Sequence, residues 1–222
     1  AYGTPFPSLL FVDATPTWND QIILCLSLSK LGLPAARTGI VIAAEPVIKA
    51  LSGINAIMNL ATGSFGAMLA EPLVRSGEIL SLSRDVVCPF YKAKMERAVS
   101  AFREAMGEDS CRWYVHKPEG AMFLWLWFPD LPISSLELYQ RLKRRGVLVV
   151  SRHYFFPGLP EDSWRHRHEC LRVTYSQDDD RVAEGLRIIA NEVKAVWREA
   201  ERVFGPTPLW VRTGRGHLQM WY

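Results

Sequence analysis

The order of apolar runs between residues 113 and 204 constrains the fold more than any other feature of the sequence. Short apolar runs at 113–118 and 121–128 precede a helical pattern, and runs at 147–151 and 170–176 precede a second one. The resulting order is strand, strand, helix, strand, strand, helix. This order predicts a small α+β domain of about a hundred residues.

The two helices of this block have recognisable ends. Ser134 and Glu137 have the spacing of a capping box, and three basic residues precede Gly146, so a helix is expected between them. Ser176 and Asp179 open the second helix, which carries its apolar residues on one face until about residue 203.

The first half of the chain has a different pattern. Residues 22–29 and 39–44 are short, apolar and rich in β-branched side chains, which predicts two buried strands. An acidic residue and a proline then begin a mostly helical stretch that is expected over 45–75. A long amphipathic helix is predicted over 83–106 and should end at Gly107.

The uncharged run between Lys49 and Glu71 contains too many glycine and asparagine residues for a membrane span, so it is expected to be buried in a soluble fold. The formal net charge of +3 is too small to indicate a nucleic-acid or membrane partner. The four cysteines form no C-x-x-C pair, which favours a reducing, cytoplasmic location over a disulfide framework.

The loop after the first apolar run holds the strongest candidate chemistry. Lys30 directly follows the run and has Ser27, Ser29 and Arg37 close by in sequence. A Schiff base needs an amine that is neutral near pH 7, which burial beside another cation favours, and hydroxyls with a guanidinium suit a phosphate. The alternative is a solvated lysine and arginine in a surface loop.

A second candidate is metal binding. His166, His168 and Cys170 alternate, so one side of a strand could present all three as ligands. Because charged residues separate them, a solvated strand edge is the favoured interpretation, and no metal site is predicted.

The segment SLSKLGLPAARTG at 27–39 is similar to the cofactor-lysine motif of fold type I pyridoxal-phosphate aminotransferases. The resemblance continues through AYGTPFP, HKPEGAMFLWLWFPDLPIS, LYQRLKRRGVLVV, FFPGLP and CLRVTYS, and it covers residues 1–200. It implies an α/β fold: the C-terminal part of a large mixed-sheet domain followed by a small α+β domain. The corresponding ranges are 1–82 for the large domain, 83–107 for a connecting helix, 108–204 for the small domain and 205–222 for an irregular tail.

The resemblance also implies roles for residues that would bind pyridoxal 5′-phosphate. Lys30 would form the Schiff base and then act as the catalytic acid and base. Ser27, Ser29 and Arg37 would hold the phosphate, and Tyr2 would donate a hydrogen bond to the 3′ oxygen of the pyridine ring.

For the substrate, the resemblance implies that Arg172 binds the α-carboxylate. The implied reaction is ping-pong transfer of an amino group from an apolar, valine-like L-amino acid to pyruvate, carried out by a homodimer. The alternatives are an aminotransferase-like sensor domain of a transcription regulator, another pyridoxal-phosphate reaction such as β-elimination, and an inactive truncated product.

The sequence departs from the family pattern in three ways. Arg37 follows Lys30 by seven residues where many relatives have eight, and Ser151 with Arg152 stands where the family usually has Pro-Gly. The second departure predicts an altered segment facing the substrate. Family members are about twice as long, so the chain is expected to be a C-terminal fragment.

Overall fold

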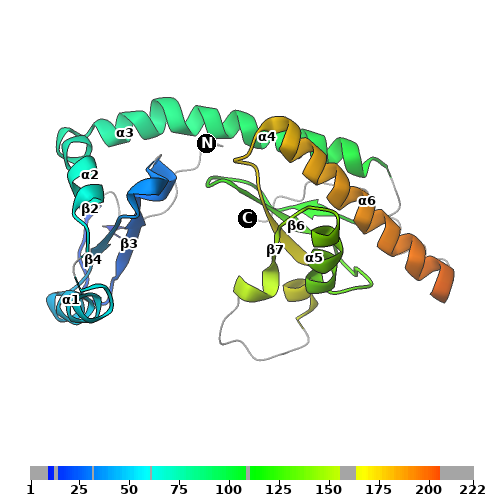
Figure 1. Cartoon of the computed structure of the whole chain (residues 1–222), viewed down its shortest axis with the longest axis horizontal. Coiled ribbons are helices and arrows are strands. Elements are labelled where there is room, and N and C mark those ends of the chain that lie inside the picture. Colours follow the sequence, from blue (N-terminus) through cyan, green and yellow to red (C-terminus); the bar gives the residue numbers. More distant parts are fainter. Residues whose placement is uncertain are drawn as a thin grey trace. The chain divides into compact units, whose positions relative to one another are not determined.

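The computed structural model describes residues 10–12, 15–31, 33–60, 62–108, 111–155 and 164–205. The chain divides into two compact units, unit 1 at residues 1–89 and unit 2 at residues 90–222, and each is described by itself (Figure 1). The boundaries expected after residues 82 and 107 stay predictions. Apart from Gly205, the predicted tail lies outside the described residues.

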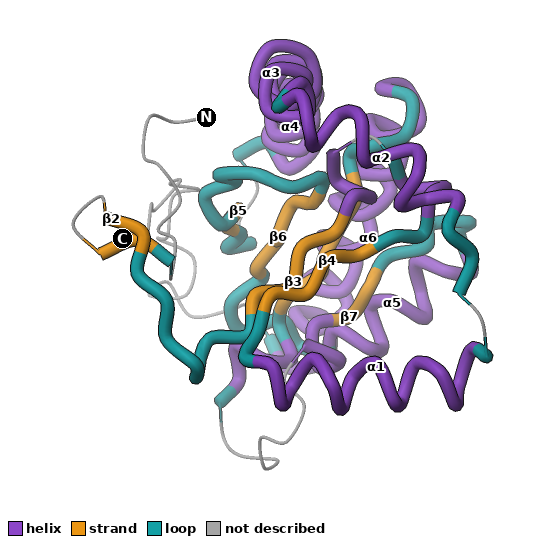
Figure 2. Tube along the Cα trace, turned by 90° about the vertical axis from the view of Figure 1, so that its left-hand side faces the viewer, coloured by secondary structure: helices purple, strands orange, loops and turns teal. Residues whose placement is uncertain are grey.

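Unit 1 is built from short strands, turns and helices. In chain order its described elements are β1 (Phe11–Val12), β2 (Thr15–Pro16), β3 (Leu24–Ser27), the 3-10 turns η1 (Leu28–Leu31) and η2 (Pro34–Ala36), β4 (Gly39–Ile42), α1 (Glu45–Asn59), α2 (Phe65–Ser76), α3 (Glu78–Leu82) and the π-helical turn η3 (Ser83–Val87). Strands β3 and β4 pair antiparallel, with Ser27 opposite Gly39 (Figure 2). The two predicted strands are thus confirmed.

The burial expected in unit 1 is wrong. Apolar side chains of α1, α2 and the segment between them are largely exposed, with Ile57 at 83%, Leu60 at 89% and Phe65 at 74%. The residues of β3 and β4 are also mostly exposed. The physical reason is that each described sheet of unit 1 has only two strands, and no further described layer of this unit covers the apolar faces.

The helical predictions in this half are largely confirmed. The stretch expected over 45–75 forms two helices, α1 and α2, interrupted near Gly63. The long helix begins earlier than expected, at Glu78, because α3, η3 and α4 (Cys88–Met106) follow one another directly. It ends at Gly107 as predicted, where a φ of 58° suits glycine.

Unit 2 contains the expected order of elements. After α4 these are β5 (Tyr114–Val115), β6 (Phe123–Trp127), α5 (Ser135–Arg144), β7 (Val150–Ser151), the 3-10 turns η4 (Arg152–Phe155) and η5 (Arg165–His168), β8 (Cys170–Thr174) and α6 (Asp179–Phe204). The strands form one antiparallel sheet in the order β5-β6-β8-β7. The small α+β arrangement is therefore confirmed.

The core of unit 2 lies on one face of this sheet. Leu124, Leu126 and Phe128 are fully buried there, against apolar side chains of α4, α5 and α6 (Figure 1). Full burial of one such side chain stabilises a fold by about 1.5–3 kcal/mol. Because side chains alternate along a strand, Trp125 and Trp127 lie on the opposite face.

Local signals set the helix ends in unit 2. The Glu137 N–H donates to Ser134 Oγ at 3.2 Å, which confirms the predicted start of α5. For α6 the N-cap position is held by Asp178, whose side chain makes no capping hydrogen bond, and the Ser176 hydroxyl pairs with Thr174 Oγ1 at 2.8 Å. Within the described ranges, no helix is both long and apolar enough to cross a membrane.

Candidate functional site

The loop that carries Lys30 is closed by backbone hydrogen bonds. Leu28 is almost fully buried, its N–H donates to the Thr38 carbonyl at 3.3 Å, and its own carbonyl accepts from the Leu33 N–H at 3.2 Å. A buried anchor at the end of β3 therefore holds η1 next to the residues that begin β4. This closure fixes the positions of the polar residues on both sides of Leu28.

The structure brings together the three residues predicted to hold a phosphate. The Ser29 N–H donates to Ser27 Oγ at 3.2 Å, and Arg37 Nη1 donates to Ser29 Oγ at 3.4 Å and to the Pro34 carbonyl at 3.2 Å. Two hydroxyls and a guanidinium thus form one exposed polar cluster. These are the groups that bind a phosphate dianion through charge-assisted hydrogen bonds.

Arg37 has an unusual backbone and an uncompensated charge. Its φ of 47° and ψ of 39°, at the C-terminal cap of η2, lie in the left-handed region, which costs a non-glycine residue about 1–3 kcal/mol. Among the residues that the structure describes, no carboxylate forms an ion pair with its guanidinium. The cluster therefore retains a positive charge for an anion.

Gly66 supports this loop, although the sequence pattern did not single it out. Gly66 is the second residue of α2, where a Cβ atom would overlap Thr38 Oγ1 and the Ala36 carbonyl oxygen. The helix can thus approach the loop around Arg37 only because residue 66 has no side chain. The sequence shows only a lone glycine near the start of an apolar helix, and glycines also occur there without any close contact.

Lys30 and Tyr2 are the remaining residues predicted to contact the cofactor. The backbone of Lys30 lies in η1, between the buried Leu28 and the end of the turn. Its position in the turn places it directly after Ser29 of the polar cluster. Tyr2 lies outside the described residues.

Arg172 lies in unit 2, on the face of the sheet opposite the core. It is paired with Trp125 of β6, and its guanidinium carbon lies 4.4 Å from the Phe123 ring centre and 4.6 Å from that of Phe155. Two aromatic faces stabilise the cation and restrict its orientation. Within the described part of the chain, no carboxylate forms an ion pair with Arg172, which leaves its donors for a ligand carboxylate.

Ser151, one of the two residues that depart from the family pattern at this point, packs inside unit 2, and the altered segment facing the substrate stays a prediction. The Ser151 side chain is buried, and its Oγ lies 2.8 Å from Oγ of the equally buried Ser135. This hydrogen bond joins β7 to the first residue of α5. Ser151 is therefore a packing residue. The side chain of Arg152 is not described.

The solvated strand edge expected at 166–170 is also wrong. Residues 165–168 form the turn η5 instead of a strand, and Cys170 is fully buried. His166 and Cys170 do lie together, but the third member of the group is His116, and His168 is not part of it. The sequence pattern could not find His116, because 50 residues separate it from His166.

Comparison with known proteins gives consistent results. The family model "Aminotransferase class I and II" matches residues 1–189. The chain is 46% identical over 200 residues to valine–pyruvate aminotransferase of Escherichia coli K12, covering 90% of this chain and 47% of that protein. The chain thus spans about half the length of the curated relatives it matches.

Solved structures agree with this match. The crystal structure of valine–pyruvate aminotransferase from Salmonella typhimurium LT2 has 47% sequence identity and a TM-score of 0.73, covering 89% of this chain and 50% of that one. Kynurenine aminotransferase of Pyrococcus horikoshii, solved in complex with PMP, has 26% identity and a TM-score of 0.64, covering 79% of this chain and 41% of that one.

Proposed function

Because the chain belongs to the aminotransferase class I and II family, we propose that the protein carrying this sequence catalyses pyridoxal-phosphate-dependent transamination. The observation that carries the proposal is the cluster of Ser27, Ser29 and Arg37 beside the backbone of Lys30. A lysine next to an anion-binding cluster is the arrangement that a phosphorylated aldehyde cofactor requires. The fold supplies both parts from one closed loop.

The described residues fit the phosphate of pyridoxal phosphate. Ser27 and Ser29 would offer hydroxyl donors, and Arg37 would offer a guanidinium whose charge has no described carboxylate partner. The complex of the Pyrococcus horikoshii relative with PMP supports a cofactor of this class. When bound, pyridoxal phosphate supplies an aldehyde carbon for the amino group and a ring that withdraws electrons.

The protein's own groups would then bind substrate and move protons. The Lys30 amine would take the proton from the substrate Cα and deliver it to the C4′ carbon of the cofactor, acting first as a base and then as an acid. The Arg172 guanidinium would bind the substrate α-carboxylate through two parallel hydrogen bonds, with its orientation restricted by Phe123 and Phe155. Tyr2 would donate to the 3′ oxygen.

We further propose an apolar, valine-like amino acid as donor and pyruvate as acceptor. The name of the Escherichia coli relative, at 46% identity, supports this choice. The apolar side chains exposed on unit 1 favour burial against another polypeptide surface, which fits a homodimer. All four cysteines carry thiols and none is in a disulfide, which fits a reducing compartment such as the cytoplasm.

The test is reductive trapping of the cofactor. Purified protein is mixed with pyridoxal phosphate, reduced with borohydride, digested and mapped by mass spectrometry. We expect one selectively modified peptide, containing Lys30. The variant Lys30→Ala should lose this label, whereas the control Lys49→Ala, at an exposed position of α1, should keep it. Scattered labelling across the lysines would contradict the proposed site.

Turnover separates the catalytic proposal from a ligand-sensing role. Lys30→Ala should lose all formation of keto acid from valine and pyruvate while amino acids still bind. Selective labelling of Lys30 with no turnover in the unmodified protein would instead support a sensor domain. Retained turnover in Lys30→Ala would exclude the role given to this lysine.

A further inference from the structure

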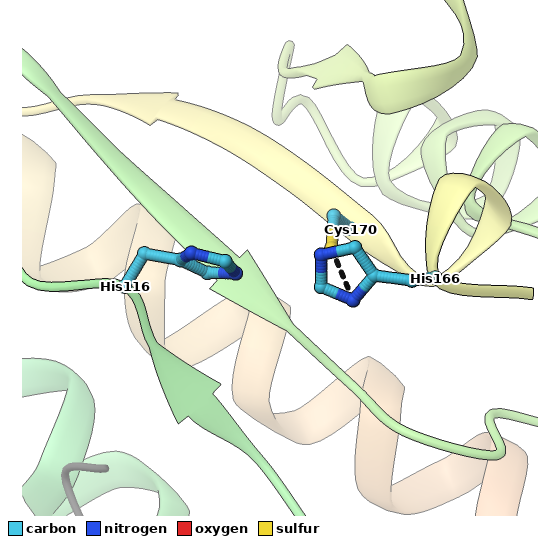
Figure 3. A group of neighbouring side chains, drawn as sticks. All are labelled: His116, His166 and Cys170. Atoms are coloured by element: carbon cyan, nitrogen blue, oxygen red, sulfur yellow. Dashed lines mark hydrogen bonds between the residues drawn. The ribbon is translucent and has the colours of Figure 1, made fainter. Parts of the chain in front are cut away.

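Three potential metal ligands meet on the outer face of the unit 2 sheet. His116 follows β5, His166 lies in η5, and Cys170 begins β8 (Figure 3). Their ligand atoms all lie within 4.8 Å of one another. Cys170 Sγ is 3.8 Å from His166 Nε2, and the two imidazole ring centres are 5.4 Å apart. The transamination proposal gives none of these residues a role.

Strand register explains why they meet. Cys170 is paired with Trp127 of β6, so its side chain lies on the face opposite the core. The His116 N–H donates to the Trp125 carbonyl at 2.9 Å, which continues the β5–β6 ladder by one residue and places His116 on the same sheet. The turn η5 then brings His166 next to Cys170, and the imidazole rings of His116 and His166 point toward each other (Figure 3).

The surroundings hold this arrangement in place. The side chain of Glu169, next to Cys170, is buried and accepts from Trp127 Nε1 at 2.9 Å and from the Asp130 N–H at 3.0 Å. Arg165, which precedes His166 in η5, forms an ion pair with Asp130 at 3.0 Å, so its positive charge is compensated. The Trp127 ring packs edge-on against His166, with ring centres 4.6 Å apart.

Two imidazoles and a thiolate are a typical donor set for zinc. In a tetrahedral zinc site with bonds of about 2.0–2.3 Å, ligand atoms are about 3.3–3.6 Å apart. The ligand atoms of the cluster, all within 4.8 Å of one another, would have to approach by at most about 1.5 Å to reach this spacing. Cys170 Sγ is almost equally far from Nδ1 and Nε2 of His166, at 4.0 and 3.8 Å. Rotation of that ring about its Cβ–Cγ bond would therefore direct a nitrogen lone pair at the ion.

We propose that His116, His166 and Cys170 bind one zinc-type divalent cation. The two histidines bind as neutral imidazoles, and Cys170 binds as a thiolate after its thiol proton passes to solvent. Water completes the tetrahedron. The ion joins η5 to the sheet and fixes the start of β8, two residues before Arg172 on the same face. All three ligands belong to unit 2.

Metal titration of the untagged protein tests the proposal. Metal is first removed with a chelator, and no pyridoxal phosphate is added, so the result does not depend on the proposed reaction. Zinc binding is measured by competition with a coloured chelator, and cobalt is used as a spectroscopic substitute. We expect one zinc per chain and a cobalt–thiolate absorption band.

Matched variants identify the ligands. Cys170→Ser should abolish the cobalt–thiolate band, and His116→Gln and His166→Gln should each weaken zinc binding by more than the roughly 10–100-fold that loss of an outer-shell partner causes. Two control variants should bind zinc as tightly as the unmodified protein does. These are Cys111→Ser, at the other buried cysteine, and His168→Gln, in the same turn as His166. Circular dichroism of each variant shows that it is folded.

Several outcomes would overturn the proposal. One is an absence of zinc binding, and another is a cobalt spectrum that Cys170→Ser leaves unchanged. A third is a loss of zinc affinity in the His168→Gln control as large as in His116→Gln and His166→Gln. If Cys170→Ser does not fold, the two histidine variants decide, because unchanged zinc affinity in both would exclude the site.

Discussion

The sharpest test of the loop geometry is a pair of glycine substitutions in unit 1. Gly66→Ala adds a methyl group where α2 touches the Arg37 loop, and Gly53→Ala adds one in α1 where no atom lies within 4 Å. Both glycines are helical, so both variants gain helix propensity, by at most about 1 kcal/mol. The difference between the two variants therefore reports the close approach at Gly66.

The cost at Gly66 can be estimated from its neighbours. The new methyl group would overlap Thr38 Oγ1 and the Ala36 carbonyl oxygen, which are themselves joined by a hydrogen bond of 2.9 Å. Relieving the overlap requires a backbone shift, and overpacking of this kind costs about 1–3 kcal/mol. Loss of the Thr38 hydrogen bond adds about 0.5–1.5 kcal/mol. After the gain in propensity of about 1 kcal/mol, we expect a net loss of about 0.5–3.5 kcal/mol.

Thermal unfolding followed by circular dichroism measures this difference. For a chain of this length, 1 kcal/mol corresponds to about 2–4 °C in the midpoint. Gly66→Ala should lower the midpoint by about 1–14 °C, and Gly53→Ala should raise it by about 1–4 °C. Phosphate affinity should fall only in Gly66→Ala, because only there is the Arg37 loop displaced.

The refuting result is a Gly66→Ala variant as stable as Gly53→Ala with unchanged phosphate affinity. That result would show that α2 does not contact the loop, and that the position of Arg37 does not depend on a glycine at 66.

Three further predictions concern unit 2. Ser151→Ala should reduce the free energy of unfolding by about 1–3 kcal/mol, because it leaves the buried Ser135 hydroxyl without this partner. Denaturant unfolding of the double variant Ser151→Ala, Ser135→Ala should show a smaller loss than the sum of the two single losses. Strict additivity of the losses would contradict the pairing. The pKa of Asp179 is held below its ordinary value, chiefly by the hydrogen bond from Lys94, so its stabilising effect is fully present above about pH 4 and is lost as pH falls through the lower folded-state pKa. The stability difference between the unmodified protein and Asp179→Asn should therefore shrink when unfolding is measured below pH 4, and an equal difference at pH 7 and pH 3 would rule out this ion pair as the cause. Arg172→Lys should lower kcat/KM about 10–100-fold for all amino acid donors alike, since the proposed bidentate contact is to the carboxylate that all donors share. If steady-state kinetics showed a loss confined to one donor, Arg172 would instead contact the side chain of that donor.

Features set by neighbouring residues could be predicted from the sequence. The capping box at Ser134 and the glycine end at Gly107 depend on contacts within a few residues, and both were found correctly. The order of strands and helices in unit 2 follows from periodicity in the same way. The polar cluster of Ser27, Ser29 and Arg37 also comes from a short segment, because Ser29 and Arg37 are eight positions apart.

Features set by distant contacts could not be predicted. The aromatic rings around Arg172 come from Phe123 and Phe155, which pack together only after the sheet and η4 have formed. His116 meets Cys170 through the register of three strands. The exposure of unit 1 was missed for another reason: apolar content indicates a tendency to be buried, and it does not show whether a covering layer is present.

The alternation of side chains along β8 affects how this protein can evolve. Leu171 and Val173 face the core, whereas Arg172 and Thr174 face the other side of the same sheet. A library of substitutions across this strand, selected for folding alone, should tolerate more change at Arg172 and Thr174 than at Leu171 and Val173. Selection for growth that depends on the proposed transamination should also reject change at Arg172. The stability of the fold and the proposed contact to the substrate carboxylate therefore depend on alternate residues of one short strand.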